Sequence, residues 1–142
     1  MSRHPDMEAM ITDVCVPLTQ LPHLIATTKQ AIAASWLPAP IVAHAGDGNF
    51  HVLIMFHPDD PKDVAEAKRL ADDMATQAIA LGGTCTGEHG VGVGKKKHLI
   101  KEMGEGTMKV MEMVKRSLDP EGLLNPGKII DVKPKGAPGI CA

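Results

Sequence analysis

The sequence predicts an α+β domain with a ferredoxin-like antiparallel sheet in the order βαββαβ, backed by helices and followed by a helical C-terminal extension. Short runs rich in β-branched residues alternate with longer segments of helical apolar period between residue 11 and about residue 86. A Gly-Asp-Gly-Asn sequence joins two of these runs, which is typical of an antiparallel hairpin. The 142 residues suffice for one domain with its own core.

The first predicted strand and helix lie between residues 11 and 40. Residues 11–16 are rich in β-branched side chains and stop before a proline, as a strand does. In the helix that follows, Pro22 can occupy the first turn, and apolar residues recur at spacings of three and four. Pro38 and Pro40 then end the helix.

Residues 40–56 form the predicted hairpin. With Asp47 and Gly48 as its two central turn residues, His44 pairs directly with His51. Opposed residues on one face of a sheet have Cβ atoms about 4.5–5.5 Å apart, so two ring nitrogens can reach one divalent ion. Two histidines near a turn are also ordinary polar residues, and this pair alone leaves both interpretations open.

The second predicted helix begins at Pro61 and is the longest element of the predicted core. Asp60 is a good N-cap and Pro61 a good first helical residue, and apolar side chains then keep a 3.6-residue period as far as Leu81. Gly82 and Gly83 end this helix. A short strand at residues 84–86 completes the predicted sheet.

Helical segments near residues 95–103 and 107–118 form the predicted C-terminal extension. Residues 131–142 contain too much proline and glycine for a regular element, and we expect a flexible tail there.

A glycine-rich loop after the last strand carries Glu88 and His89. A carboxylate beside an imidazole among glycines suits a site where the backbone approaches a ligand and a base projects from a rigid edge. A flexible linker is the alternative. In the order βαββαβ this loop follows a strand beside the first one, so Glu88 can approach His44 and His51. Two histidines and one glutamate make a metal site with open positions.

Composition argues against several other functions. The formal charge of −2 and an aromatic content of 2% argue against a nucleic-acid partner. Three cysteines without a Cys-x-x-Cys pair argue against a disulfide framework, and neither a phosphate-binding loop nor a dinucleotide fingerprint occurs. No apolar run approaches about 20 residues and the start lacks a secretory pattern, so we expect no transmembrane segment and a cytoplasmic location.

Three motifs in order resemble one known family. They are A-H-A-G-D-G-N-F-H at 43–51, T-G-E-H-G-V-G at 86–92 and L-D-P-E-G-L-L-N-P-G-K at 118–128, and T-D-V-C-V-P at 12–17 fits as well. Together they resemble the C-terminal domain of FAD-linked oxidases, which are vanillyl-alcohol-oxidase-type flavoproteins. Members of this family include the D-lactate dehydrogenases and the FAD subunit of glycolate oxidase. The resemblance covers residues 11–130.

The resemblance implies oxidation of a D-2-hydroxy acid of the D-lactate or glycolate type, with FAD as the electron acceptor. It implies that a divalent cation, zinc or manganese by its nitrogen and oxygen ligands, is held by His44, His51 and Glu88. His89 is then the base that takes the hydroxyl proton. Asn125 and Lys128 of the last motif are expected near the flavin.

The resemblance also implies that residues 11–130 are part of a substrate domain whose N-terminal FAD-binding domain is absent from these 142 residues. The expected partners are a small 2-hydroxy acid and a FAD-binding domain in cis or in trans, and a homo-oligomer is left open. We expect the chain alone to be inactive. The alternative is a free-standing metal-binding or protein-interaction module without catalysis of its own.

Overall fold

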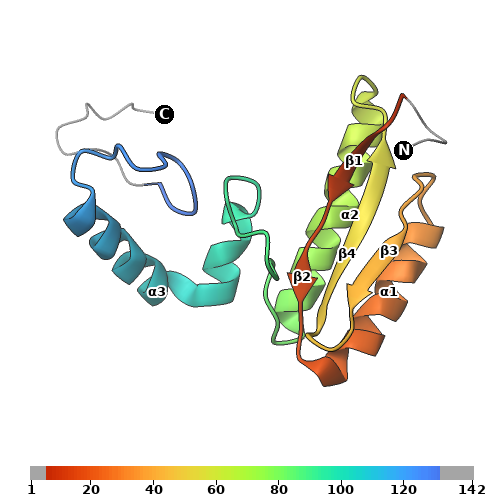
Figure 1. The fold of residues 1–142 in the computed structure, drawn as a ribbon, viewed down its shortest axis with the longest axis horizontal. Helices are drawn as coiled ribbons and strands as arrows, with labels where there is room; N and C mark the ends of the chain where they lie inside the picture. The colour runs from red at the N-terminus through yellow and green to blue at the C-terminus, as the bar shows by residue number, and fades with distance from the viewer. Residues whose placement is uncertain (1–5, 132–142) are drawn as a thin grey trace. The chain divides into compact units, whose positions relative to one another are not determined.

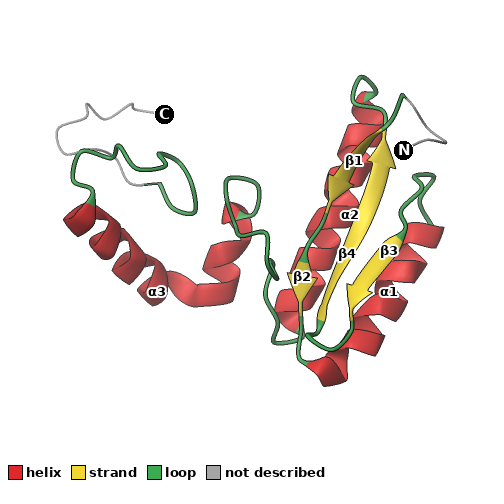
Figure 2. Ribbon diagram, in the orientation of Figure 1, coloured by secondary structure: helices red, strands yellow, loops and turns green. Residues whose placement is uncertain are grey.

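A computed structural model describes residues 6–131, which divide into two compact units, the first ending at Gly90 and the second beginning at Val91. The first unit contains β1 (Glu8–Ile11), β2 (Val14–Cys15), the short 3-10 helix η1 (Leu18–Gln20), α1 (Leu21–Ala33), β3 (Ile41–His44), β4 (Asn49–Phe56) and α2 (Pro61–Ala80). The second contains α3 (Lys96–Leu118). Figure 1 labels these elements, and Figure 2 separates helices, strands and loops by colour.

The strand β4 is the centre of the antiparallel sheet in the first unit. It pairs with β1 and β2 along one edge and with β3 along the other (Figure 1). Ile11 lies opposite Leu53 and Val14 opposite Phe50, so β1 and β2 keep one register against β4. The predicted strand at residues 11–16 therefore begins earlier, at Glu8, and is interrupted between Ile11 and Val14.

The predicted fourth strand at residues 84–86 is reduced to one isolated antiparallel bridge between Cys15 and Thr84. An antiparallel sheet with helices confirms the predicted α+β class. The finer ferredoxin-like description stays a prediction, because the last strand of that arrangement forms only this bridge.

The hydrophobic core lies between the sheet and the two helices α1 and α2, which cover one of its faces (Figure 1). Alternate side chains of β4, those of Phe50, Val52 and Ile54, are fully buried there. Burial of one such side chain stabilises the fold by about 1.5–3 kcal/mol. Because side chains alternate along a strand, Asn49 and His51 point to the opposite face of the sheet.

Both helices of the first unit begin as their sequences predict. Helix α1 starts at Leu21 with Pro22 in its first turn. Helix α2 starts at Pro61, and the Asp60 side chain accepts a hydrogen bond of 2.8 Å from the amide of Lys62. After α2 the chain turns at Gly82, whose φ is 76°. Local capping thus defines these elements before any tertiary contact is considered.

In the second unit, α3 contains both helical segments predicted for the C-terminal extension. They meet at Gly104, whose φ of 75° and ψ of 160° are not helical. No helix among residues 6–131 is long and apolar enough to cross a membrane. The predicted flexible tail lies outside the described residues except for Asp131, which pairs with Lys96 at 2.5 Å.

Candidate metal centre

The hairpin between β3 and β4 presents its two histidines in a register that differs from the predicted one. His44 lies opposite Asn49, and His51 lies opposite Val42. The predicted direct pairing of His44 with His51 is therefore wrong. The loop has four residues, with a turn closed from the Asp47 amide to the His44 carbonyl at 2.9 Å, and the Gly48 carbonyl accepts from the amide of Val16. Gly48 is thus bonded to the segment after β2 and does not form the predicted two-residue turn with Asp47.

The two histidines nevertheless lie on the same face of the sheet as diagonal neighbours, which aromatic side chains can bridge. Their ring centroids are 5.2 Å apart and the rings are nearly perpendicular, at 83°. His51 is buried against the sheet and the side chain of His44 is half-exposed. One imidazole is therefore fixed and the other stands at the rim.

Glu88 connects the glycine-rich loop to both histidines. Its Oε1 lies 3.1 Å from Nε2 of His51 and 3.8 Å from Nε2 of His44. Nε2 of His89 also lies 3.8 Å from the same oxygen. The ring of His89 stacks on that of His51, with centroids 5.0 Å apart and an angle of 16° between the planes. Three imidazoles therefore surround one carboxylate oxygen.

The break between β1 and β2 orients the ring of His51. Oγ1 of Thr12 accepts the hydrogen bond of the Val52 amide at 2.9 Å, a bond that a strand carbonyl would otherwise accept. The carbonyl of Thr12 lies instead 3.1 Å from Nδ1 of His51. Because a carbonyl can only accept, Nδ1 is the ring nitrogen that donates to Thr12, and Nε2 is the one that faces Glu88. This is the usual second contact of a metal-binding histidine.

Asp13 holds the loop that carries Glu88 and His89. Its side chain is fully buried, and its Oδ2 accepts hydrogen bonds from the backbone amides of three consecutive residues. These are Gly87 at 2.9 Å, Glu88 at 2.9 Å and His89 at 2.8 Å. The hydroxyl of Thr86 donates to the same oxygen at 3.0 Å. A carboxylate in a nest of amides fixes the loop backbone against the sheet.

The approach of this loop to the sheet requires glycine at position 87. A Cβ atom there would lie 2.6 Å from Oδ1 of Asp13 and 2.6 Å from Oδ1 of Asn49. Asn49 is buried beside the site, and its Oδ1 has no hydrogen-bond partner among residues 6–131. The sequence analysis predicts a functional role for this glycine-rich loop, and the close contact explains why its first residue, Gly87, has no side chain.

The cluster of His44, His51 and Glu88 fits a divalent cation. One ligand atom from each residue lies within 4.8 Å of the others. Two imidazole nitrogens and one carboxylate oxygen form a donor set typical of zinc and related transition metals, with positions left for water or substrate. The structure thus brings together the three predicted ligands and the predicted base, His89.

Comparisons with known proteins agree with this arrangement of motifs. Residues 1–129 match the family described as FAD linked oxidases, C-terminal domain. The chain belongs to this family. It is 52% identical over 126 residues to the mitochondrial D-lactate dehydrogenase (cytochrome) of Arabidopsis thaliana, a match that covers 89% of this chain and 22% of that protein.

Two further relatives of this FAD-linked oxidase domain have similar coverage. A probable mitochondrial D-lactate dehydrogenase of Danio rerio is 43% identical over 132 residues, which are 93% of this chain and 27% of that protein. Glycolate oxidase subunit GlcD of Escherichia coli K12 is 34% identical over 126 residues, 89% of this chain and 25% of the subunit. The chain therefore spans about a quarter of the length of these relatives.

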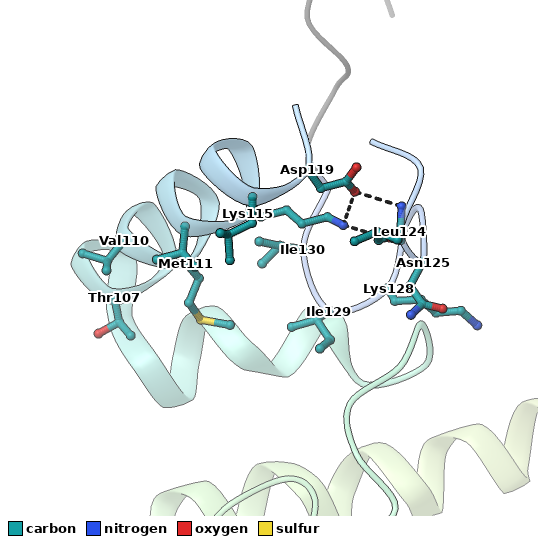
Figure 3. Close-up of a pocket in the computed structure, with 12 residues that line it drawn as sticks. Thr107, Val110, Met111, Lys115, Asp119, Leu124, Asn125, Lys128, Ile129 and Ile130 are labelled. Carbon is teal, nitrogen blue, oxygen red and sulfur yellow. Dashed lines mark hydrogen bonds and ion pairs between the residues drawn. The ribbon is translucent and has the colours of Figure 1, made fainter. Parts of the chain in front are cut away.

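Asn125 and Lys128, the predicted flavin neighbours, belong to the second unit of this FAD-linked oxidase domain. They line a cavity of about 490 Å³ between α3 and the segment that follows it (Figure 3). Most of its walls are apolar, with Val110, Met111, Leu124 and Ile130 among them. Neither residue is part of the imidazole cluster, and their place beside a flavin stays a prediction.

Asp119 supports the wall of this cavity. It accepts a hydrogen bond from the amide of Leu124 at 2.9 Å and pairs with Lys115 at 2.5 Å (Figure 3). It also accepts a hydrogen bond from the amide of Leu123 at 2.9 Å. The hydrogen bond from Lys115, with those two amides, lowers the pKa of Asp119 to about 2.

A second carboxylate and imidazole pair lies beyond the opposite end of β4. The buried Asp63 accepts hydrogen bonds from Nε1 of Trp36 at 2.8 Å, and from the amide and Nδ1 of His57 at 3.1 and 2.8 Å. The bond from Trp36, followed by those from His57, lowers the pKa of Asp63 to about 2. These bonds tie the chain after α1 to the start of α2, away from the candidate metal centre.

Sequence reasoning missed two residues of the site, Thr12 and Asp13. The T-D-V-C-V-P motif that contains them contributes only to the family resemblance. A usable signal was present: a buried strand rarely contains an aspartate, and Asp13 interrupts an otherwise apolar and β-branched run. Such a residue needs hydrogen-bond donors, which the loop at residues 86–89 provides.

Proposed function

We propose that this chain supplies the metal-binding and proton-accepting part of a FAD-dependent oxidoreductase that converts a D-2-hydroxy acid into a 2-oxo acid. The observation that carries the proposal is the placement of three imidazoles around one carboxylate oxygen on a face of the sheet that the helices leave uncovered. The names of the relatives, D-lactate dehydrogenase and glycolate oxidase, support a small hydroxy acid as the substrate class.

In this proposal His44, His51 and Glu88 hold a divalent cation, zinc or manganese. His51 is the fixed ligand, because the Thr12 carbonyl orients its ring and its Nε2 faces Glu88. His44 and Glu88 are more exposed and complete the site from the solvent side. A cation bound there would polarise the substrate hydroxyl and lower its pKa.

His89 is the proposed general base. Its side chain is half-exposed, so a substrate can reach it, and its stacking on His51 keeps it beside the ligands. It takes the proton of the substrate hydroxyl while the hydrogen on the α-carbon leaves with two electrons as hydride. FAD, the cofactor in the family's name, would accept that hydride.

Residues 6–131 contain no glycine pattern of the dinucleotide-binding or phosphate-binding type. We therefore propose that a FAD-binding domain, in cis or in trans, holds most of the cofactor, with Asn125 and Lys128 at its flavin side. Two relatives are named as mitochondrial, so the predicted cytoplasmic location stays a prediction.

The test of the metal site uses the chain itself. Purified protein should bind one equivalent of Zn²⁺ or Mn²⁺ in a calorimetric titration, and His51→Ala should abolish that stoichiometric binding. His57→Ala is the matched control, because His57 is also hydrogen-bonded to its surroundings but lies beyond the other end of β4. Unchanged metal content in His51→Ala would remove His51 from the site.

The test of catalysis uses a chimera in which this chain replaces the matching C-terminal segment of the Arabidopsis relative. Flavin reduction by D-lactate should fall about 10²–10⁴-fold in His89→Ala, with metal content kept. Glu88→Gln should weaken metal binding by about 10–100-fold or more. Loss of metal in His89→Ala with retention in Glu88→Gln would reverse the two roles. A chimera with full metal and flavin but no turnover would favour the binding-module alternative.

A further inference from the structure

The interruption of the first strand places a buried carboxylate directly behind the candidate metal centre. We propose that Asp13 is a positioning residue that sets where Glu88 and His89 stand relative to His51. The inference deepens the proposed function and rests on it. It concerns a residue that touches neither the substrate nor the cation.

Asp13 gathers three consecutive backbone amides of the loop at one atom. Its Oδ2 receives the amides of Gly87, Glu88 and His89 within 2.8–2.9 Å. The backbone amides of Glu88 and His89, the proposed ligand and the proposed base, therefore bond to the same oxygen. A shift of that oxygen would move the Cα atoms of both residues together.

The loop has few other restraints on its backbone. The sheet ends at the bridge between Cys15 and Thr84, and Gly87 and Gly90 flank the pair of active residues. Glycine costs more conformational entropy to order than any other residue, so strong bonds are needed to hold such a loop. Hydrogen bonds from backbone amides to an ionised carboxylate are about twice as strong as hydrogen bonds between neutral groups.

The same carboxylate also lies close to the fixed ligand. Oδ1 of Asp13 is 3.8 Å from Nδ1 of His51, the ring atom that bonds to the Thr12 carbonyl. Asp13 thus links both halves of the site, the strand that carries His51 and the loop that carries Glu88. Because the Asp13 side chain is fully buried, water does not compete with the loop amides for its oxygens.

Asp13 could instead be read as a ligand, since it forms a second possible metal-holding group with His51 and His89. Two observations favour positioning. Four donors already occupy its Oδ2, and its side chain is completely buried. Glu88, by contrast, has an exposed carboxylate beside two imidazoles. A cation can enter from the side of Glu88 without breaking the bonds that hold the loop.

The experiment compares Asp13→Asn with wild type in two measurements on the whole chain. Co²⁺ titration followed by visible absorbance reports metal affinity and ligand geometry. Amide hydrogen exchange reports the order of residues 87–89 and, separately, of β4. We expect Co²⁺ affinity to fall about 10–100-fold. We also expect faster exchange at residues 87–89 and unchanged protection of β4.

Asp63→Asn is the matched control. Asp63 is another buried aspartate of the first unit that accepts a backbone amide, at a site beyond the other end of β4. It should leave Co²⁺ affinity unchanged. Thr86→Val is a milder second variant that removes one donor to Asp13 and keeps its charge. It should weaken Co²⁺ binding by about 2–10-fold, the equivalent of one hydrogen bond, and it decides the question if Asp13→Asn does not fold.

Each other outcome overturns a stated claim. Equal Co²⁺ affinity in Asp13→Asn and wild type overturns the positioning role while the proposed metal site stands. Loss of β4 protection together with affinity makes Asp13 a residue of the fold and also overturns the role. If Asp13→Asn is unfolded, unchanged Co²⁺ affinity in Thr86→Val overturns the positioning role. A wild-type chain that binds no Co²⁺ overturns the proposed metal site, and the inference falls with it.

Discussion

The two units of the chain differ in how completely they bury their apolar side chains. Among residues 6–131, the first unit holds fifteen of the seventeen buried hydrophobic residues, and the second holds Leu99 and Ile130. Of the fourteen large hydrophobic residues that are exposed in the described part of the chain, ten lie in the second unit, with Val110, Met113 and Leu118 of α3 among them. The first unit thus encloses a core of its own, whereas the second leaves most of its apolar surface uncovered.

Each unit also anchors a loop on a buried aspartate, and the two anchors show the same contrast. Asp13 is fixed by a sheet whose other face is packed against helices. Asp119 binds the amides of Leu123 and Leu124 and the side chain of Lys115, all within one stretch of ten residues. Long-range packing therefore supports the candidate metal centre, while mainly local bonds support the segment that carries Asn125 and Lys128.

The largest expected effect comes from separating the units. Residues 1–90 alone should unfold cooperatively and keep the metal site, because core and ligands all lie within them. Residues 91–142 alone should show no cooperative transition, because so small a segment buries too little apolar surface. Circular dichroism melts and Zn²⁺ titration check both statements. A first unit that unfolds or loses its metal when separated would end the distinction between the units.

The next effect compares one large side chain from each unit. Phe50→Ala should lower the free energy of unfolding by about 3–5 kcal/mol, because it leaves a cavity in a closed core. Val110→Ala, at an exposed position of α3, should change it by less than about 0.5 kcal/mol. Urea denaturation measures both. Similar losses in the two variants would mean that Val110 is covered in solution.

A smaller effect is expected at the bend within α3. The φ of 75° and ψ of 160° at Gly104 lie in a region that only glycine adopts readily. Gly104→Ala should therefore strain the bend by about 1–3 kcal/mol, which circular dichroism of the whole chain detects as a loss of helix signal from α3. Metal affinity of the first unit should not change. Reduced metal affinity in this variant would show that the conformation of α3 affects the imidazole cluster.

The smallest effect is a pH dependence confined to the first unit. The pKa of Asp63 in the folded state, about 2, lies below its ordinary value of about 4. Ionised Asp63 therefore stabilises the fold above pH 4, and this contribution is lost as the pH falls from about 4 to about 2. Asp63→Asn should lack this dependence. The fluorescence of Trp36, the single tryptophan, reports it because its indole donates to Asp63.

Asp119→Asn provides the control for this measurement. The pKa of Asp119 is also lowered to about 2, but the residue lies in the second unit. If the units are independent, this substitution leaves the acid titration of Trp36 fluorescence as in wild type. A shifted titration would couple the two units.

Features that depend on near neighbours in the sequence were predictable. The start of α2 at Pro61, the start of α1 around Pro22 and the existence of the hairpin follow from capping, proline geometry and apolar period. The structure also places Glu88 beside His44 and His51, as expected from the sequence, while their binding of a metal stays a prediction.

Features that depend on distant partners were decided by the tertiary structure. The register of His44 and His51 depends on a loop whose Gly48 carbonyl bonds to Val16, 32 positions earlier in the chain. The hydrogen bond that Asp13 accepts from the amide of His89 joins residues 76 positions apart. Residue types and periodicity determine which side chains can bind a cation, but hydrogen bonds between remote segments determine how those side chains are aimed, because only the folded chain brings their donors and acceptors together.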